Sequence, residues 1–393
     1  MKALYKFFIL LLVISFIAPY IATEKPWYVL YHHRHLFPAF SFKNQIKIYG
    51  EIISYDETDW KHLAADKIIF APIPWSPGKS DFENAGYVNP FAKQFFRDDQ
   101  NKIISMPLQF RHWLGTDKRG ADVFSGVLNG ARVSLFVGIC SMVIASLIGI
   151  FLGALAGYAG NDLIKIKSAM ILCFIPALIL ILFYAKFISS GNFSFQLMQF
   201  ILIAIIILLI FYFIGKMLMQ IKFLRKKVFL RLDAIISRLI EWIVSLPRLI
   251  IVLSIAAITQ PSILSLTIII GCTSWTEIAR LIRAEFLKEK QLNYVMAAKA
   301  LGYSHRRIIF RHLLPNAITP SLVVIFLGIS SAILAEAGLS FLGIGVPQNI
   351  VTWGNMLASG KENFEAWWLV VFPGSALFGT ILLFNSIAER LRE

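Results

Sequence analysis

Eight runs of about twenty mostly apolar residues constrain this chain more strongly than any other feature of its sequence. They cover residues 3–22, 131–157, 168–188, 196–215, 234–258, 263–282, 317–335 and 367–387. A helix of about twenty residues crosses a hydrocarbon core of about 30 Å. In lipid, the backbone N–H and C=O groups of such a segment must form their hydrogen bonds within the protein, as they do in a helix. We therefore predict an all-α membrane protein, a polytopic helix bundle with about eight transmembrane helices.

The composition agrees with a membrane protein. The chain is 57% hydrophobic and 16% charged, whereas a soluble domain carries about 25% charged residues. Its net charge of +15 would suggest a nucleic-acid partner in a soluble protein. In a membrane protein an excess of Lys and Arg marks the cytoplasmic face instead, so no nucleic-acid partner is expected.

Lys and Arg are distributed unevenly over the connections between the runs. Residues 280–311 contain eight of them, whereas residues 189–195 and 259–262 contain none. Because Lys and Arg accumulate in cytoplasmic loops, the alternation predicts a multi-pass protein of the cell inner membrane with both termini in the cytoplasm.

This orientation places residues 23–125 outside the cytoplasm, as an exported region after an N-terminal transmembrane helix at 1–22. The region mixes charges, aromatic residues and turn pairs, and its sequence does not choose between a small domain and an extended cap. A cleaved signal peptide is the alternative for the first helix, because Lys2 and Lys6 precede an apolar core that ends in small residues.

The polar connection after the sixth run has helical order. Four residues on one predicted helix face follow the i, i+3, i+4, i+7 spacing: Tyr294, Ala297, Ala298 and Leu301. Gly302 then stands where a helix would end, since glycine accepts the left-handed conformation. The two alanines would let another surface approach the backbone closely. The pattern predicts a short cytoplasmic helix that docks in a partner's groove.

These residues resemble a known motif. The pair Ala297-Ala298, followed by Gly302 and by Leu314-Pro315, is similar to the "EAA" loop in permease subunits of binding-protein-dependent ABC transporters, and its surroundings resemble the dipeptide/oligopeptide/nickel branch. Met296 stands where the motif has Glu, so a salt bridge from that position is absent.

Other segments resemble the same branch in the same order. LGTDKRGADV at 114–123 and GARVSL at 130–135 are similar to its second span, with Ala121 where Arg is usual. EAGLSFLG at 336–343 and WGNML at 353–357 are similar to its later segments. The resemblance covers most of residues 110–392.

The resemblance implies a permease domain of the type I ABC importer kind at 126–393, with a coupling loop at 283–316. The residues expected to couple the loop to an ATPase are Tyr294, Ala297, Ala298, Gly302, Leu314 and Pro315. The implied partners are a second homologous permease, two cytoplasmic ATP-binding subunits, an extracytoplasmic substrate-binding protein and membrane lipid. The chain would import short peptides; nickel or a peptide antibiotic is the alternative.

The resemblance implies a transport subunit rather than an enzyme, with no cofactor, no metal and no catalytic residues of its own. Gly78-Lys79-Ser80 lacks the earlier glycine that a phosphate-binding loop needs. The cluster His32-His33-Arg34-His35 has no carboxylate or thiolate at ligand spacing and is interpreted as a polar patch. An ion-coupled secondary transporter is the rival class, but it would need ionisable residues at mid-membrane.

One departure from the family pattern is an inserted helix pair within about 162–232. Asp162, Lys167 and Pro176 each lie 71 residues before Asp233, Arg238 and Pro247. This spacing suggests that a two-helix unit was duplicated. The two regions should then superpose with both prolines equivalent.

Two further features lie within the runs. Gly149, Gly153 and Gly157 form a strip without side chains along which another helix, of this chain or of another subunit, can pack. Glu336 places a carboxylate at the end of an apolar run, which makes it a candidate for the transport pathway or for a structural role.

Overall fold

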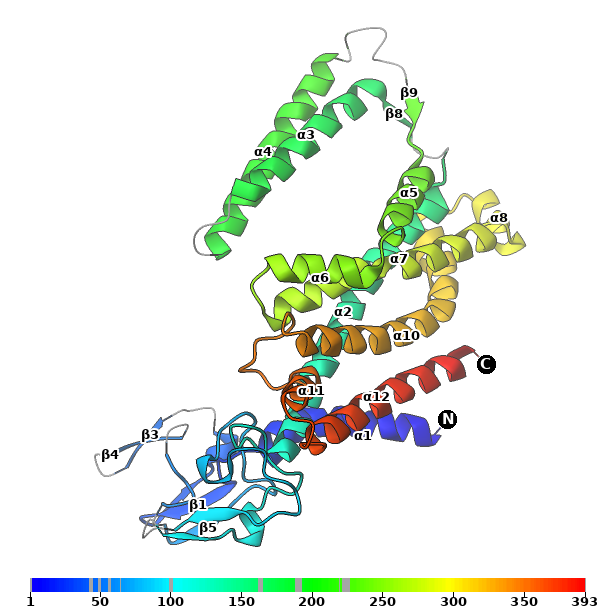
Figure 1. The fold of residues 1–393 in the computed structure, drawn as a ribbon. Coiled ribbons are helices and arrows are strands. Elements are labelled where there is room, and N and C mark those ends of the chain that lie inside the picture. Colours follow the sequence, from blue (N-terminus) through cyan, green and yellow to red (C-terminus); the bar gives the residue numbers. More distant parts are fainter. Residues whose placement is uncertain are drawn as a thin grey trace.

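α-Helices account for most of the chain in the computed structural model (Figure 1), which describes residues 2–41, 45–48, 51–55, 58–63, 65–98, 102–161, 165–187, 193–218, 220 and 227–392. The longer helices of the bundle are α1 (Lys2–Ile21), α2 (Val123–Ala159), α5 (Leu232–Val244), α6 (Arg248–Ile258), α7 (Ile263–Glu289), α10 (Leu314–Phe341) and α12 (Trp368–Arg392). Shorter elements connect them: α8 (Asn293–Ala300), α9 (His305–Ile308), the π-helical turn η5 (Ile309–Leu313) and α11 (Trp353–Glu362).

α2 is the central helix of the bundle. It is 37 residues long and packs along α7 and α10, while α10 also packs against α12. Gly149, Gly153 and Gly157 lie on the face of α2 that meets α7. A Cβ atom at Gly153 would stand 2.6 Å from the carbonyl oxygen of Ala279, and one at Gly157 would stand 2.5 Å from Cβ of Phe286. The glycine strip therefore brings α2 against a helix of the same chain.

Three helices in the described part of the chain are long and apolar enough to cross a membrane: Val123–Ala159, His305–Phe341 and Trp368–Arg392. They coincide with the predicted runs at 131–157, 317–335 and 367–387. Shorter apolar helices cover Lys6–Ile21, Ser168–Ile181 and Leu202–Leu218. The prediction of a bundle of apolar helices is thus confirmed. The total of eight spans stays a prediction.

The single helix predicted at 234–258 is interrupted. The chain forms α5 and α6 instead, and their axes are bent by 80° at the break before Pro247. Proline has no N–H for the helix ladder and disfavours helical geometry in the residue before it. Pro247 consequently ends one helix and stands at the N-cap of the next, although apolar residues continue on both sides. With α5 and α6 counted as one broken span, four helices of the described chain could cross a membrane.

Residues 23–122 form a separate body of short strands and loops at one end of the bundle (Figure 1). A three-stranded antiparallel sheet has the order β2 (Arg34–Leu36), β1 (Tyr28–Tyr31), β5 (Lys67–Ile69), with Val29 opposite both Leu36 and Ile68. Two hairpins accompany it: β3 (Gln45–Ile48) with β4 (Glu51–Ser54), and β6 (Phe95–Arg97) with β7 (Ile103–Ser105). Four residues form a small core beside the sheet: Val29, Leu36, Tyr55 and Trp60.

The His32-His33 pair is the turn between β1 and β2. Both residues have positive φ angles, 46° and 57°, which a two-residue hairpin turn of type I′ requires. The residues interpreted as a polar patch therefore have a local structural role.

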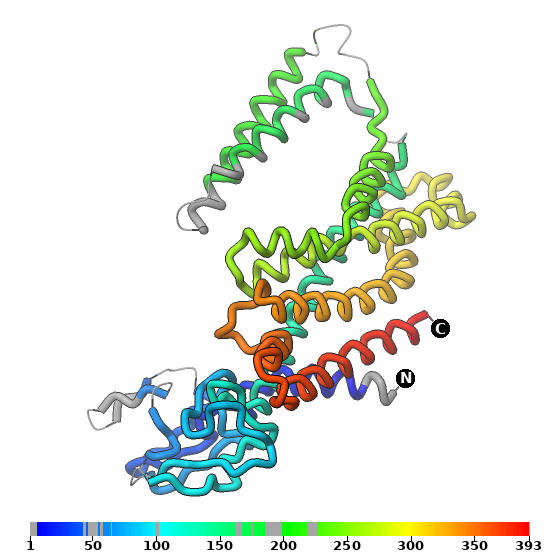
Figure 2. The backbone as a smooth tube through the Cα atoms, in the orientation of Figure 1, coloured from blue at the N-terminus to red at the C-terminus, as the bar shows by residue number. Residues whose placement is uncertain are grey.

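The helix pair that the sequence predicts as an insertion is a hairpin of α3 (Ser168–Phe187) and α4 (Phe193–Leu218) that projects from the bundle (Figures 1 and 2). Two short antiparallel strands, β8 (Lys165–Lys167) and β9 (Lys227–Phe229), lie side by side at its base. Nearby, the backbone N–H of Asp233 donates to the carbonyl oxygen of Gly160 at 3.3 Å. The chain therefore leaves α2 and returns to α5 at nearly the same point.

The duplication hypothesis is wrong by its own criterion. Pro176 lies inside the continuous helix α3, whereas Pro247 stands at the 80° break between α5 and α6. Lys167 ends a strand, whereas Arg238 lies within α5. Asp162, the third residue of the proposed match, lies outside the described residues. Two apolar helix pairs share a proline spacing without sharing a structure.

Candidate functional site

α8 presents apolar side chains in two directions. Val295 and Ala298 are buried against the bundle. Met296, with 51% of its surface exposed, and Leu301, with 73%, face away from it. Tyr294 and Ala297 are also exposed. Ala298 therefore belongs to the anchored side of the helix, not to the free face on which the sequence placed it, because packing within the chain takes up that side.

Gly302 ends α8 in the way that its position predicts. Its φ angle is +75°, and its N–H donates to the carbonyl oxygen of Lys299 at 3.0 Å while the N–H of Tyr303 donates to that of Ala298 at 3.1 Å. This pair of bonds is a Schellman motif, which satisfies the last carbonyl groups of a helix. No atom lies within 4 Å of the place a Cβ atom would take, so the requirement for glycine comes from the backbone alone.

Leu314 and Pro315 mark the other end of the connection. Ser304 caps α9 by accepting from the N–H of Arg307, and η5 then leads directly into α10. Leu314 is the first residue of α10 and Pro315 lies in its first turn, directly after the π-helical turn η5. Ile308 and Leu313 are buried. The connection is therefore a folded unit fixed to the bundle.

Polar contacts join this unit to the end of α2, and an ion pair nearby joins α7 to α5. The Tyr158 hydroxyl at the end of α2 lies 2.5 Å from Nδ1 of His305, and the Lys290 ammonium donates to the carbonyl oxygen of Tyr158 at 2.8 Å. Arg283 of α7 forms a bidentate ion pair with Asp233 of α5, with Nη2 and Oδ2 2.8 Å apart. The residues on either side of α8 are therefore tied to the end of α2, and α7, which leads into α8, is tied to α5.

Tyr294 is held by two polar neighbours. Its hydroxyl donates to the Glu289 carboxylate, and the Asn316 amide donates to the hydroxyl at 3.0 Å. Partial burial, together with the bond to Glu289, raises the pKa of Tyr294. The phenol therefore stays neutral at physiological pH and ties the start of α8 to the start of α10.

Glu336 is buried between α10 and α2. Its Oε2 accepts from the hydroxyl of Ser134 at 2.8 Å and its Oε1 from that of Ser340 at 2.9 Å. The side chain is 0% exposed, and no ion pair to it is present in the described part of the chain. Hydroxyl donors thus satisfy the carboxyl group, an arrangement that joins two helices.

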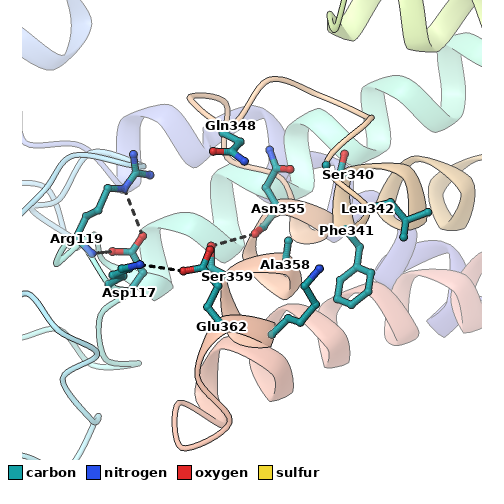
Figure 3. Close-up of a pocket in the computed structure, with 13 residues that line it drawn as sticks. Asp117, Arg119, Ser340, Phe341, Leu342, Gln348, Asn355, Ala358, Ser359 and Glu362 are labelled. Atoms are coloured by element: carbon teal, nitrogen blue, oxygen red, sulfur yellow. Dashed lines mark hydrogen bonds and ion pairs between the residues drawn. The ribbon is translucent and has the colours of Figure 1, made fainter. Parts of the chain in front are cut away.

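A second site lies at the other end of the bundle, where residues 23–122 meet it (Figure 3). Asp117 and Arg119 line one side of a cavity of about 340 Å³, and Asn355 and Glu362 of α11 line the other. Lys118 forms an ion pair with Glu362 at 3.3 Å. Two segments that resemble the family, 114–123 and 353–357, thus line one cavity, although 230 residues separate them.

Sequence reasoning missed a buried cluster beside this cavity. The ring of His112 is 0% exposed; its Nδ1 lies 2.9 Å from Asp122 and its Nε2 lies 3.1 Å from Asp81. Burial lowers the pKa of His112, but the hydrogen bonds to the two carboxylates outweigh it and raise the pKa overall. Asp122 also caps α2 by accepting from the N–H of Ser125 at 2.7 Å.

One signal for this cluster is visible in the sequence. Asp122 directly precedes a long apolar run, which is the position of a helix N-cap. The partners Asp81 and His112 carry no such signal, because the fold brings them together from segments 31 residues apart.

Comparison with known proteins identifies the family of this chain. The model of the binding-protein-dependent transport system inner membrane component family matches residues 217–393. A di/tripeptide transport system permease protein of Pseudomonas aeruginosa is 30% identical, with 72% of each chain covered. A dipeptide transport system permease protein of Bacillus subtilis is 28% identical, over 74% of this chain and 69% of its own. The chain therefore belongs to the family of inner membrane permease components of binding-protein-dependent ABC transport systems.

Proposed function

We propose that this chain is the transmembrane permease subunit of an ATP-driven importer of short peptides. The observation that carries the proposal is the likeness over most of the chain to peptide transport permeases of several bacteria. The exposed apolar face of α8 supports the proposed coupling to a motor subunit, because large apolar side chains at a surface mark an interaction site.

In this proposal the face formed by Tyr294, Met296, Ala297 and Leu301, the docking face, lies in a groove of a cytoplasmic ATP-binding subunit. Gly302 and Pro315 hold the ends of the connection, and Val295 and Ala298 fix it to the bundle. When two ATP-binding subunits close on ATP, α8 moves with them. The contacts from His305 and Lys290 to Tyr158 transmit that movement to α2.

The remaining partners follow from the same proposal. A second, homologous permease supplies the other half of the translocation pathway, and an extracytoplasmic binding protein delivers the peptide. The Lys and Arg residues of 280–311 then face the cytoplasm, and residues 23–122 with the cavity of Figure 3 face the binding protein.

The test is co-purification with the ATP-binding subunits after substitution on the docking face. We expect Leu301→Asp to reduce the ATP-binding subunits that co-purify by at least about tenfold, since a buried apolar contact worth about 1.5–3 kcal/mol is lost. The matched control is Phe364→Asp, which changes a side chain that is 90% exposed in the connection between α11 and α12. Equal co-purification of the Leu301 variant and the wild type would contradict the docking face.

Uptake by the reconstituted complex tests the substrate. We expect ATP-dependent uptake of a labelled dipeptide that needs the binding protein. ATP-dependent uptake of nickel or of a peptide antibiotic in its place would change the substrate but not the class. Uptake driven by an ion gradient without ATP would contradict the whole proposal.

A further inference from the structure

The α3–α4 hairpin has an apolar surface with no protein against it. In the described part of the chain, α3 and α4 pack mainly against each other, and the hairpin joins the bundle through β8 and β9 (Figures 1 and 2). Large side chains such as Phe174, Phe183 and Phe213 are more than half exposed. A helix that is apolar on all sides is stable in lipid or in a protein core, so this surface needs an apolar environment.

An apolar groove runs along the half of the hairpin next to its base. Met170, Cys173 and Ala177 of α3 line one side of it, and Ile205, Leu209 and Tyr212 of α4 line the other. Its volume is about 440 Å³. Residues 170–177 span about 10 Å of helix at 1.5 Å per residue, so the groove suits part of an acyl chain.

Lysines gather where this groove meets the base of the hairpin. β8 and β9 pair so that Lys167 stands directly opposite Lys227. Lys165 lies opposite Phe229, with its ammonium 4.8 Å from the centre of that ring. Lys216 is exposed in the last turn of α4. Like charges directly opposite each other destabilise a strand pair, so the register points to an anion between them.

The insertion itself supplies no anion. Residues 163–232 contain nine Lys and Arg and no Asp or Glu. Among the described residues, no ion pair joins Lys165, Lys167 or Lys227 to a carboxylate. The groove and the lysines together require a ligand with an apolar chain and a negatively charged head.

We propose that the base of the hairpin is a binding site for an anionic phospholipid. The phosphate of the headgroup contacts Lys165, Lys167 and Lys227, and one acyl chain lies in the groove between α3 and α4. The insertion then anchors the permease to anionic lipid at a point outside the helix bundle. Basic residues next to a membrane helix attract anionic headgroups in this way.

The experiment measures the lipid that co-purifies with the full chain. The protein is extracted from membranes that contain phosphatidylethanolamine and phosphatidylglycerol, delipidated mildly, and its bound lipid is quantified by mass spectrometry. We expect phosphatidylglycerol to be enriched, and the triple variant Lys165→Gln, Lys167→Gln, Lys227→Gln to lower that enrichment by at least about fivefold, the effect of one such charge.

Two controls separate the site from net charge and from misfolding. The first removes three exposed lysines of the 23–122 segment, Lys67, Lys93 and Lys102, and should keep the enrichment. The second replaces the three base lysines with arginine and should also keep it, because the charge is retained.

Two outcomes would overturn the proposal. Unchanged phosphatidylglycerol in the triple Gln variant would show that the base binds no lipid. Unchanged lipid together with a loss of co-purifying ATP-binding subunits would assign the lysines to a protein partner. The readout is bound lipid, so it remains valid whether or not the chain transports peptides.

Discussion

At the scale of single residues, His112 lies between two carboxylates. Asp81 and Asp122 contact its two ring nitrogens, and the Lys61 ammonium lies over the Trp75 ring, which packs against His112. Burial lowers the pKa of Lys61 to about 8. The pKa of Asp81 is lowered, because hydrogen bonds from His112 and Asn84 outweigh the effect of burial. Through these two contacts His112 links the 23–122 segment to the start of α2.

The direction of the His112 pKa shift determines how the stability of the fold depends on pH. Because the pKa of His112 is raised on folding, its contribution is fully present below the unfolded value of about 6.5 and is lost as pH rises through the folded value. We expect the thermal unfolding midpoint of the wild type to fall from pH 6 towards pH 9 more steeply than that of His112→Gln. The control His33→Gln should keep the wild-type slope. Asp81 loses its contribution only at acid pH, so it does not obscure the result.

Substitutions of Glu336 can distinguish a structural role of this carboxylate from a role in transport. Glu336→Ala leaves the hydroxyls of Ser134 and Ser340 without their acceptor, which destabilises a fold by about 1–3 kcal/mol. Glu336→Gln keeps an oxygen acceptor and should destabilise less. We expect unfolding midpoints in the order wild type, Gln, Ala. Uptake that is lost in Glu336→Gln at wild-type stability would instead place this carboxylate in the transport pathway.

At the scale of elements, the end of α8 at Gly302 is the feature that a substitution can test. We expect Gly302→Val to leave the protein inserted and folded but to separate ATP hydrolysis from transport, because a β-branched residue at a φ of +75° moves the end of the helix. Peptide uptake falls while ATPase activity of the complex persists.

Gly379 is the matched control for Gly302. It also has open space around it, but its φ angle is not positive, so Gly379→Val changes size without this backbone strain. Unchanged peptide uptake in the Gly302 variant would contradict a coupling role for the end of α8.

The elements also show what local sequence can predict. The helix end at Gly302 was predictable because the end of a helix depends on one or two residues. The bend before Pro247 was missed because apolar residues continue through it, although the proline itself is a signal for a helix break. The inward position of Ala298 was missed because the surrounding helices, not the spacing in α8, decide which side is buried.

At the scale of the whole molecule, we expect the α3–α4 hairpin to be separable from the bundle. Excision of residues 162–232, with a short glycine linker between Asn161 and Asp233, keeps two chain ends that already contact each other. We expect this variant to retain its ATP-binding subunits and peptide uptake but to lose phosphatidylglycerol enrichment. Monodisperse size-exclusion profiles check folding. Loss of the ATP-binding subunits in a well-folded variant would make the hairpin part of the transport machinery.

The sequence could show little about the structure of residues 23–122, because that structure depends on contacts between distant positions. Apolar runs predict helices because each helix satisfies its own backbone. Strands of three or four residues need partners from distant positions, as when Leu30 pairs with both His35 and Lys67. The His112 cluster depends on this tertiary arrangement, so only its N-cap member left a trace in the sequence.

The continuous length of α2 has a mechanical consequence. Its 37 residues extend about 55 Å, from Asp122 beside His112 to Tyr158 beside His305. No proline interrupts it. In the proposed coupling mechanism, a movement at one end of α2 reaches the other end without a proline hinge between them. The two ends of α2 would therefore move together.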